Sequence, residues 1–297
     1  VYWSYNNKLK ALKNKFMLTS TKELLEAAQK HSYAIGAFNL YNLEGAKAVV
    51  NAAEAENSPA MLQILPHVLQ YAGSPLIALF LEAADSAKVP ISVHLDHCNE
   101  DGMIKTALEA GLQSVLADGS SLPLPENLAF TREMTHLAHA KGATVEAEVG
   151  RISGTEDGMT VAEKEAKMTE PQEAQEFVAE SGVDFLAVTI GNVHGKYHGE
   201  PQLDFDRLAK IREQLDIPLV LHGASGLPAT MIKQSIELGV CKFNVNSEVR
   251  KKYLQFWQEY GRAESKSDLL DCQKAVTAAM QEVIAEKMRL FGSAGKA

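Results

Sequence analysis

The chain alternates short apolar runs with helical patterns along almost its whole length, and this alternation limits the folds open to it. Most runs are nearly continuous stretches of β-branched and other apolar residues, as expected of parallel strands that helices cover. Eight strand–helix units follow one another at intervals of roughly 25–30 residues. The predicted strands cover residues 33–39, 60–65, 91–96, 114–118, 143–149, 185–190, 218–222 and 241–246, and the predicted helices cover 43–57, 75–88, 102–110, 126–141, 171–181, 205–215, 228–238 and 248 onward.

Eight such units favour a closed (β/α)8 barrel, the TIM barrel, over an open doubly wound sheet, because closure removes both sheet edges. Residues 19–23 have the pattern of a capping box, which predicts an extra N-terminal helix placed to close the lower end of the barrel. Residues 268–290 predict a C-terminal helical extension that packs on the barrel or on a partner subunit. We therefore expect an N-terminal extension over residues 1–18 and a single α/β barrel domain over residues 19–297.

Composition and charge exclude several classes of function. A net charge of −9 argues against a nucleic-acid partner and against an anionic membrane surface. No apolar run approaches the roughly 18 residues of a membrane span. Cys98, Cys241 and Cys272 are odd in number and far apart, which is typical of reduced thiols in a reducing compartment, and we expect a cytoplasmic protein.

Polar residues gather where the predicted strands end, which is where barrel enzymes carry their active sites. His97, His194 and His222 lie at or just beyond the ends of three different strands. Three imidazoles with an open position make the ligand set of a catalytic Zn²⁺, and Glu148 offers an auxiliary carboxylate. Each histidine alone fits a buried core or loop residue better than a metal ligand, so the hypothesis rests on their shared level in the barrel beside inward carboxylates.

Two loops predict further parts of an active site. Residues 222–228 form a small-residue loop before a helix at the customary phosphate site of a barrel, where Gly223 admits close backbone approach and Ser225 and Ser247 can donate hydroxyls. Residues 151–169 form a polar stretch too long for a plain connection, which suggests either a lid or a solvated acidic loop. An acidic residue of this stretch, such as Glu156, could transfer protons over a bound substrate.

In these residues the sequence resembles the class II, zinc-dependent ketose-bisphosphate aldolases, the fructose- and tagatose-bisphosphate aldolase family. The resemblance runs from about residue 34 to residue 250. It is carried by AFN at 37–39, HLDH at 94–97, DGS at 118–120, VEAEVG at 145–150, GTEDG at 154–158, GNVHG at 191–195, LHGASG at 221–226 and NVNS at 244–247.

The resemblance implies a TIM-barrel lyase that reversibly cleaves a phosphorylated ketose to dihydroxyacetone phosphate and an aldehyde, with one catalytic Zn²⁺. A monovalent cation and a homodimer or homotetramer are compatible with it. By the same resemblance Asp96 is the acid/base at the substrate's C4 hydroxyl and Glu156 the proton-transfer residue of the lid. The implied metal ligands are His97, His194 and His222, with Glu148 alternative or auxiliary, and the implied substrate- and phosphate-binding residues are Asn39, Gly195, Gly223, Ser225, Asn244, Asn246 and Ser247.

Several positions depart from the family pattern. His198 stands where a phosphate-binding lysine is usual, with Lys196 two residues earlier, and Ser121 stands where histidine is usual. Residues 63–67 lack a small hydroxyl residue, and residues 268–273 show no counterpart of the arginine that grips a second phosphate. These departures fit carbon–carbon cleavage with one phosphate and leave a bisphosphate substrate open.

Other functions stay open on the sequence. A Schiff-base aldolase would need a buried lysine, and Lys242 points inward but lies near the start of its strand. A metal-dependent epimerase or decarboxylase, or an aldolase, acting on a sugar-acid monophosphate would use the same zinc and lid. A non-catalytic sugar-phosphate binder and a C-terminal module of a multidomain protein are further alternatives, the latter suggested by the ending at residues 289–297.

Overall fold

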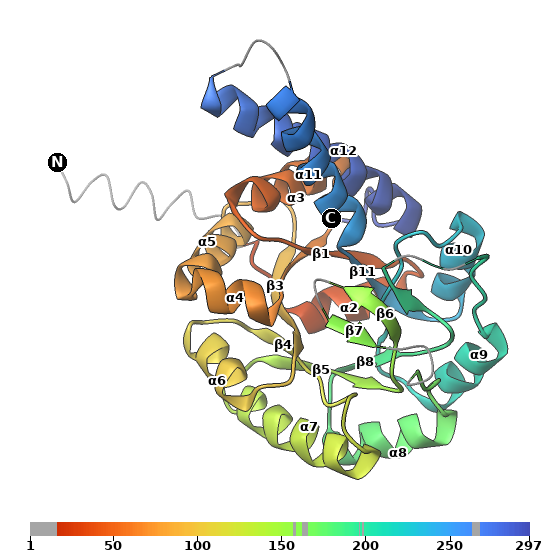
Figure 1. Cartoon of the computed structure of the whole chain (residues 1–297). Coiled ribbons are helices and arrows are strands. Elements are labelled where there is room, and N and C mark those ends of the chain that lie inside the picture. Colours follow the sequence, from red (N-terminus) through yellow and green to blue (C-terminus); the bar gives the residue numbers. More distant parts are fainter. Residues whose placement is uncertain (1–16, 157–158, 162–165, 196, 198, 263–267) are drawn as a thin grey trace.

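The computed structural model describes residues 17–297, apart from 157–158, 162–165, 196, 198 and 263–267 (Figure 1). Its centre is a closed barrel in which every neighbouring pair of strands is parallel. The order around the barrel is β1-β11-β10-β8-β5-β4-β3-β2. These strands are β1 Ile35–Asn39, β2 Ala60–Ile64, β3 Ile91–Cys98, β4 Ser114–Ala117, β5 Thr144–Val149, β8 Phe185–Val188, β10 Leu219–Leu221 and β11 Val240–Val245.

Helices surround the barrel, as the predicted fold requires (Figure 1). Each predicted helix is present with ends that differ by a few residues, and the second unit carries an additional helix that the sequence analysis missed, Pro66–Ala72. The helices between strands are α3 Leu43–Glu56, α4 Pro66–Ala72, α5 Ser74–Asp85, α6 Asp101–Glu109, α7 Leu124–His139, α8 Pro171–Ser181, α9 Phe205–Gln214 and α10 Ala229–Glu237. Helix α11, Ser247–Arg262, follows the last strand, and α12, Leu269–Phe291, is the predicted C-terminal extension.

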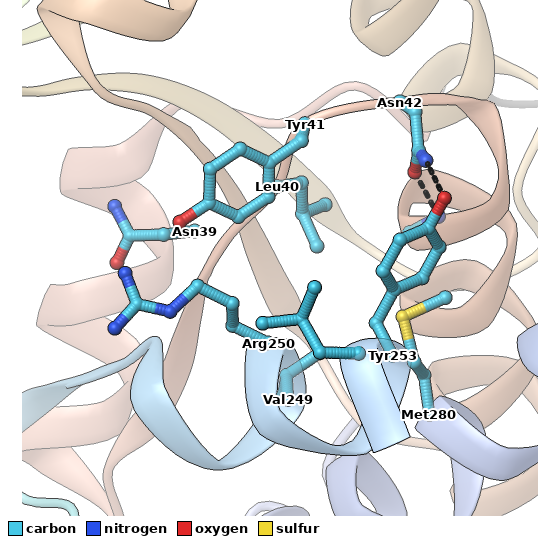
Figure 2. A pocket seen from close by; sticks show the side chains of 10 residues that line it. Asn39, Leu40, Tyr41, Asn42, Val249, Arg250, Tyr253 and Met280 are labelled. Carbon is cyan, nitrogen blue, oxygen red and sulfur yellow. Dashed lines mark hydrogen bonds between the residues drawn. The ribbon is translucent and has the colours of Figure 1, made fainter. Parts of the chain in front are cut away.

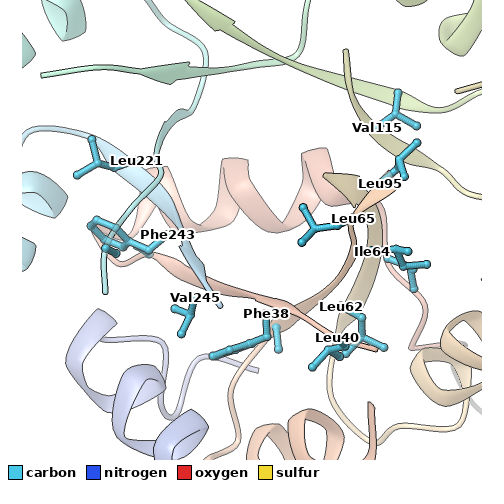
Figure 3. Close-up of a cluster of buried hydrophobic side chains, with 14 of the residues drawn as sticks. Phe38, Leu40, Leu62, Ile64, Leu65, Leu95, Val115, Leu221, Phe243 and Val245 are labelled. Atoms are coloured by element: carbon cyan, nitrogen blue, oxygen red, sulfur yellow. The ribbon is translucent and has the colours of Figure 1, made fainter. Parts of the chain in front are cut away.

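The period of two along each strand divides the apolar side chains between two cores. Side chains on the outer face, such as Phe38, Leu62 and Val245, point toward the surrounding helices (Figure 3). There the Phe243 ring stacks on Phe291 of α12, with the ring centroids 4.9 Å apart. The inner face supplies a second, smaller cluster inside the barrel, which contains Ile35, Ala37, Met61, Phe185, Ala187, Val220 and Cys241.

The N-terminal helix α2, Thr21–Lys30, closes one end of the barrel as predicted. Leu24, Leu25 and Ala28 pack in the inner cluster, against side chains such as Ile35 and Cys241 near the strand starts. The predicted capping box is wrong: Ser20 precedes the helix without a side-chain cap bond, and the Thr19 hydroxyl donates to the Met17 carbonyl. Hydrophobic burial therefore fixes this helix, and no capping side chain is needed.

The predicted long loop over residues 151–169 contains a β-hairpin. Strand β6, Ser153–Glu156, pairs antiparallel with β7, Met159–Val161, and parallel with β9, Val193–His194. The pattern of this stretch is polar because the small sheet lies outside the barrel core, so apolar periodicity could not reveal it. Within the described part of the chain, none of the helices is both long and apolar enough to cross a membrane.

The outer core supports a stability prediction. Phe38 is fully buried between β1 and the helices, so Phe38→Ala should leave a cavity and lower the free energy of unfolding by about 3–5 kcal/mol. Urea denaturation measures this change. Tyr71→Ala is the control, since Tyr71 is 94% exposed and its loss should stay within about 0.5 kcal/mol. Equal changes in the two variants would contradict the assignment of Phe38 to the core.

Candidate metal centre and active site

His97 reaches the barrel mouth through a local break in its strand. Strict alternation along β3 would send Asp96 and His97 to opposite faces of the sheet. The β3–β4 register shifts between Leu95 and Cys98, and His97 has a φ of 49°, in the left-handed region that non-glycine residues rarely adopt. This conformation costs about 1–3 kcal/mol, and it brings the side chains of both Asp96 and His97 to the carboxyl end of the barrel.

The structure brings the three predicted histidines together. One ring nitrogen from each of His97, His194 and His222 lies within 4.8 Å of the other two. The ring centroids are 5.1 Å apart for His97 and His194, 4.6 Å for His97 and His222, and 6.0 Å for His194 and His222. The residues come from β3, β9 and the loop after β10, so they meet because the barrel is closed.

Carboxylates behind two of these rings select which nitrogen faces the cluster. Asp118 Oδ2 lies 2.7 Å from His97 Nδ1, and Glu146 Oε1 lies 2.9 Å from His222 Nε2. His97 Nε2 has no hydrogen-bond partner among the described residues and is buried. A carboxylate behind a ligating imidazole is the usual outer partner of a metal-bound histidine. Asp118 and Glu146 belong to the DGS and VEAEVG motifs, but the sequence did not predict this role for them; Asp118 directly follows β4, and Glu146 lies within β5.

Glu148 completes the candidate donor set. Its Oε2 lies 3.2 Å from His222 Nδ1, and Glu148 also forms a second possible group of ligands with His97 and Asp118. Three imidazole nitrogens and one carboxylate oxygen are donors that suit Zn²⁺. The buried His97 Nε2, which lacks a partner in the described chain, is the observation that such an ion would explain. The residues present therefore fit a metal ion.

The surroundings of the cluster oppose a positive charge on the His194 ring and favour one on the His97 ring. Burial, followed by the neighbouring imidazoles, lowers the pKa of His194 well below its ordinary value. Burial also opposes a charge on His97, but the carboxylates of Asp96 and Asp118 outweigh it and raise the pKa of that ring well above its ordinary value. The carboxylates around His97 attract positive charge, and the neutral His194 ring has a lone pair to offer. Both properties suit a bound cation.

Asp96 is buried beside the cluster and held by two amides. Asn39 Nδ2 donates to its Oδ2 at 2.8 Å, and Asn244 Nδ2 donates to its Oδ1 at 3.1 Å. Burial alone would raise the pKa of Asp96, but His97 and then Lys242 outweigh this effect and hold the pKa below its usual value. Asp96 is thus positioned as an ionised acceptor. Asn39 and Asn244, which the family resemblance assigns to substrate, contact this carboxylate.

The predicted phosphate residues lie in the connections that follow three adjacent barrel strands, β8, β10 and β11. Gly223 has a φ of 67°, and a Cβ atom there would stand 2.2 Å from the Val193 carbonyl oxygen, so no larger residue fits. The Tyr197 hydroxyl donates to the Gly223 carbonyl at 2.9 Å and ties the two loops together. The other candidates in this region are Gly195 in the loop after β9, Ser225 in the loop after β10, Asn246 after β11 and Ser247 at the start of α11.

The structure describes only part of the predicted lid. The backbone of Glu156 ends β6, and β6 pairs with β9, which carries His194, so the hairpin is anchored beside the histidine cluster. The position of the Glu156 side chain, and the departures noted at Lys196 and His198, lie outside the described residues.

A cavity of about 310 Å³, which the sequence did not predict, lies beside Asn39, the residue whose amide donates a hydrogen bond to Asp96. It is lined by the end of β1, by α11 and by Met280 of α12; Figure 2 shows Arg250 reaching from α11 toward Asn39 and Tyr41. The Tyr41 hydroxyl donates to Asn246 Oδ1 at 3.1 Å. Partial burial and then the charge of Arg250 lower the pKa of His67, which places that ring within the field of the guanidinium. The cavity therefore contains a positive side chain, Arg250, and shares Asn39 with the surroundings of Asp96.

Comparisons with known proteins find a matching family and several similar chains. The family model of class-II fructose-bisphosphate aldolase matches residues 19–296. A 6-phospho-5-dehydro-2-deoxy-D-gluconate aldolase of Bacillus licheniformis is 41% identical over 288 residues, which cover 94% of this chain and 96% of the relative.

Two solved structures are also similar over most of their length. A Coccidioides immitis protein, solved as a candidate fructose-1,6-bisphosphate aldolase, has a TM-score of 0.88 and 40% identity over 93% of this chain and 97% of its own. The YdjI aldolase of Escherichia coli K12 has a TM-score of 0.85 and 33% identity over 95% of this chain and 100% of its own.

Proposed function

The chain belongs to the class-II fructose-bisphosphate aldolase family, and from this premise we propose that it reversibly cleaves a phosphorylated ketose to dihydroxyacetone phosphate and an aldehyde. The family makes it a carbon–carbon lyase of the metal-dependent class. The observation that carries the proposal is the meeting of His97, His194 and His222 beside the buried Asp96. Lys242, the candidate for a Schiff-base route, is fully buried and paired with Glu146 instead.

The proposed metal is one Zn²⁺, held by His97, His194 and His222 with Glu148 as auxiliary ligand. When bound, a zinc ion supplies Lewis-acid chemistry, polarising a carbonyl and stabilising the negative charge that develops as the bond breaks. Asp118 and Glu146 would orient two of the histidines through their other ring nitrogens.

Asp96 is proposed to take the proton of the C4 hydroxyl. As that O–H bond breaks, its electron pair forms the aldehyde carbonyl, and the C3–C4 pair passes to the triose half. A base for this step must be ionised and within about 3 Å of the hydroxyl. The low pKa of Asp96, where His97 and Lys242 overcome the effect of burial, and the two amides that fix it meet the first need. Glu156 is proposed to transfer a proton at the triose half.

The phosphate of the triose half is proposed to bind at the loops after β9, β10 and β11. Gly195 and Gly223 permit close backbone approach, and Ser225 and Ser247 carry hydroxyls that can donate to phosphate oxygens. Asn246 lies beside this loop pair, and Asn39 and Asn244 reach the substrate from the side of Asp96.

The aldehyde half is proposed to carry a second anion. Arg250 and Asn39, the hydrogen-bond partner of Asp96, line the same cavity, and Arg250 supplies a cation there. A fructose or tagatose 1,6-bisphosphate would place a phosphate in this cavity, and a sugar-acid monophosphate would place a carboxylate. The 41% identical relative is named for a phosphorylated sugar acid, which favours the second alternative.

Arg250→Met tests the distal cavity. Loss of a charge-assisted hydrogen bond to the anion should lower kcat/KM by about 10–100-fold for the preferred ketose. Inhibition by dihydroxyacetone phosphate should be unchanged, because that product carries no distal anion. Lys251→Met, one residue away on the exposed face of α11, is the matched control. An unchanged kcat/KM in Arg250→Met would remove this residue from the substrate site.

The activity itself is tested by measuring dihydroxyacetone phosphate release from a panel of ketose bisphosphates and phosphorylated keto sugar acids, with zinc-loaded protein. We expect release from at least one member of the panel. Conversion of substrate without a triose product would instead indicate an epimerase or decarboxylase. Binding without any turnover would indicate a sugar-phosphate binder.

Residues 19–297 are proposed to act as one barrel domain within a homodimer or homotetramer. Helices α11 and α12 project beyond the ring of helices (Figure 1), and Leu254, Leu269 and Leu270 on them are more than half exposed. Exposed apolar side chains on a projecting pair of helices are typical of a protein–protein contact. Sedimentation of the purified chain measures the assembly.

A further inference from the structure

The barrel interior contains a buried charged pair behind the histidine cluster. Lys242 on β11 and Glu146 on β5 are fully buried, and Lys242 Nζ lies 2.8 Å from Glu146 Oε2. Removing two charges from water is costly, and apolar residues of similar size often stabilise such a site equally well or better. Stability alone therefore does not account for this pair.

The other oxygen of Glu146 leads to the histidine cluster. Glu146 Oε1 lies 2.9 Å from His222 Nε2. A carboxylate accepts hydrogen bonds, so Nε2 carries a hydrogen, and Nδ1, which has no hydrogen-bond partner among the described residues, is the nitrogen left to bind an ion. Nδ1 is the nitrogen on the side of Glu148, 3.2 Å from its Oε2. Glu146 thus determines which nitrogen His222 presents to the site.

His94 could compete with His222 for the Glu146 carboxylate. Its Oε2 lies 3.5 Å from His94 Nε2, a buried nitrogen without a hydrogen-bond partner among the described residues. His94 Nδ1 is already paired with the Ser114 hydroxyl at 2.7 Å. If Lys242 did not occupy Oε2, the carboxylate could turn toward His94 and release His222.

We propose that Lys242 is a positioning residue for the metal centre, which acts by holding Glu146 so that Glu146 fixes the tautomer and orientation of His222. The ammonium group binds one carboxylate oxygen and leaves the other directed at the ring. All three side chains are fully buried, so water does not compete for these contacts. This inference rests on the proposed function, because it assumes that His222 is a metal ligand.

The experiment measures metal binding apart from catalysis. The Zn²⁺ dissociation constant of the full chain is determined by competition with a chromophoric chelator, and the visible spectrum of the Co²⁺-loaded protein reports the ligand geometry. Lys242→Met should raise the dissociation constant by about 10–100-fold, as loss of an outer-shell partner does. The Co²⁺ absorption bands should also shift or weaken, because His222 is no longer fixed.

Phe243→Leu is the matched control. Phe243 is the next residue of β11, faces the outer core and stacks on Phe291. Its substitution should lower the Tm but leave the Zn²⁺ dissociation constant within about twofold of wild type, since it changes no residue behind a ligand. Weaker metal binding in Phe243→Leu, equal to that in Lys242→Met, would reduce Lys242 to a general stabilising residue and overturn the proposal.

The double variant Lys242→Met/Glu146→Gln provides a test that does not depend on the folding of the single variant. It leaves no uncompensated charge in the barrel, and it should still bind Zn²⁺ more weakly than wild type because the neutral amide is a weaker acceptor for His222. Wild-type affinity in either variant would overturn the role of Lys242. Failure of the wild-type protein to bind a divalent ion would instead overturn the proposed function.

Discussion

Asp96→Asn should lower kcat by about 10²–10⁴-fold, which is the range expected when a general base is removed. The amide has nearly the shape of the carboxylate but cannot take the proton of the C4 hydroxyl. Its oxygen can still accept one of the hydrogen bonds from Asn39 and Asn244, so the barrel should remain folded. The measurement is kcat on the preferred ketose, together with zinc content by elemental analysis.

Zinc content distinguishes a chemical role of Asp96 from a structural one. We expect one zinc per chain in Asp96→Asn, because its neighbour His97 is oriented from the other side by Asp118. Asp184→Asn is the control for loss of a buried carboxylate, since Asp184 pairs with Lys22 and His139 away from the histidine cluster. That variant should be less stable and keep its kcat. Loss of zinc together with activity in Asp96→Asn would make Asp96 a structural residue.

Removal of the metal with a chelator should reduce turnover by on the order of 10³-fold, because several kcal/mol of charge stabilisation are lost. Zn²⁺ should restore activity. The measurement is the release of dihydroxyacetone phosphate before and after zinc is returned. Far-ultraviolet circular dichroism should change little, since the two apolar cores of the barrel do not depend on the metal.

Addition of Mg²⁺ or Ca²⁺ in place of zinc is the control. These cations prefer six or more oxygen ligands, whereas the cluster offers three imidazoles, so neither should restore turnover. Full activity in protein shown by elemental analysis to lack metal would contradict the assignment of the cluster as a catalytic metal centre.

Much of the fold follows from the local sequence because parallel strands covered by helices must be apolar on both faces. Every barrel strand was predicted to within a few residues, and so was one helix in each strand–helix unit. The misses have other causes. The hairpin β6–β7 lies outside the main core, where pairing with β9 decides the structure. Helix α4 has seven residues, begins at a proline and buries only Val68 and Leu69 in the core, so no long apolar period marks it.

The sequence predicted which residues form the candidate site, but it did not predict most of the contacts between them. His97, His194 and His222 could be grouped because a barrel brings all strand ends to one face. The outer partners Asp118 and Glu146 could not be paired with particular ring nitrogens, since that depends on distances between strands. The sequence did not single out Arg250, because this residue lies in the first turn of α11 beyond the end of β11, where a charged residue is ordinarily solvated.

The sequence by itself determined the barrel, the carboxyl-end location of the histidines and the family, because repeated apolar strands and ordered motifs are local properties. The tertiary structure decided how adjacent Asp96 and His97 reach one site. Alternation along β3 separates them, and the pairing of β3 with β4 forces the register shift that places His97 in the left-handed region. A backbone conformation that is unfavourable for an isolated residue is held there by the neighbouring strand and by Asp118, neither of which lies next to His97 in the chain.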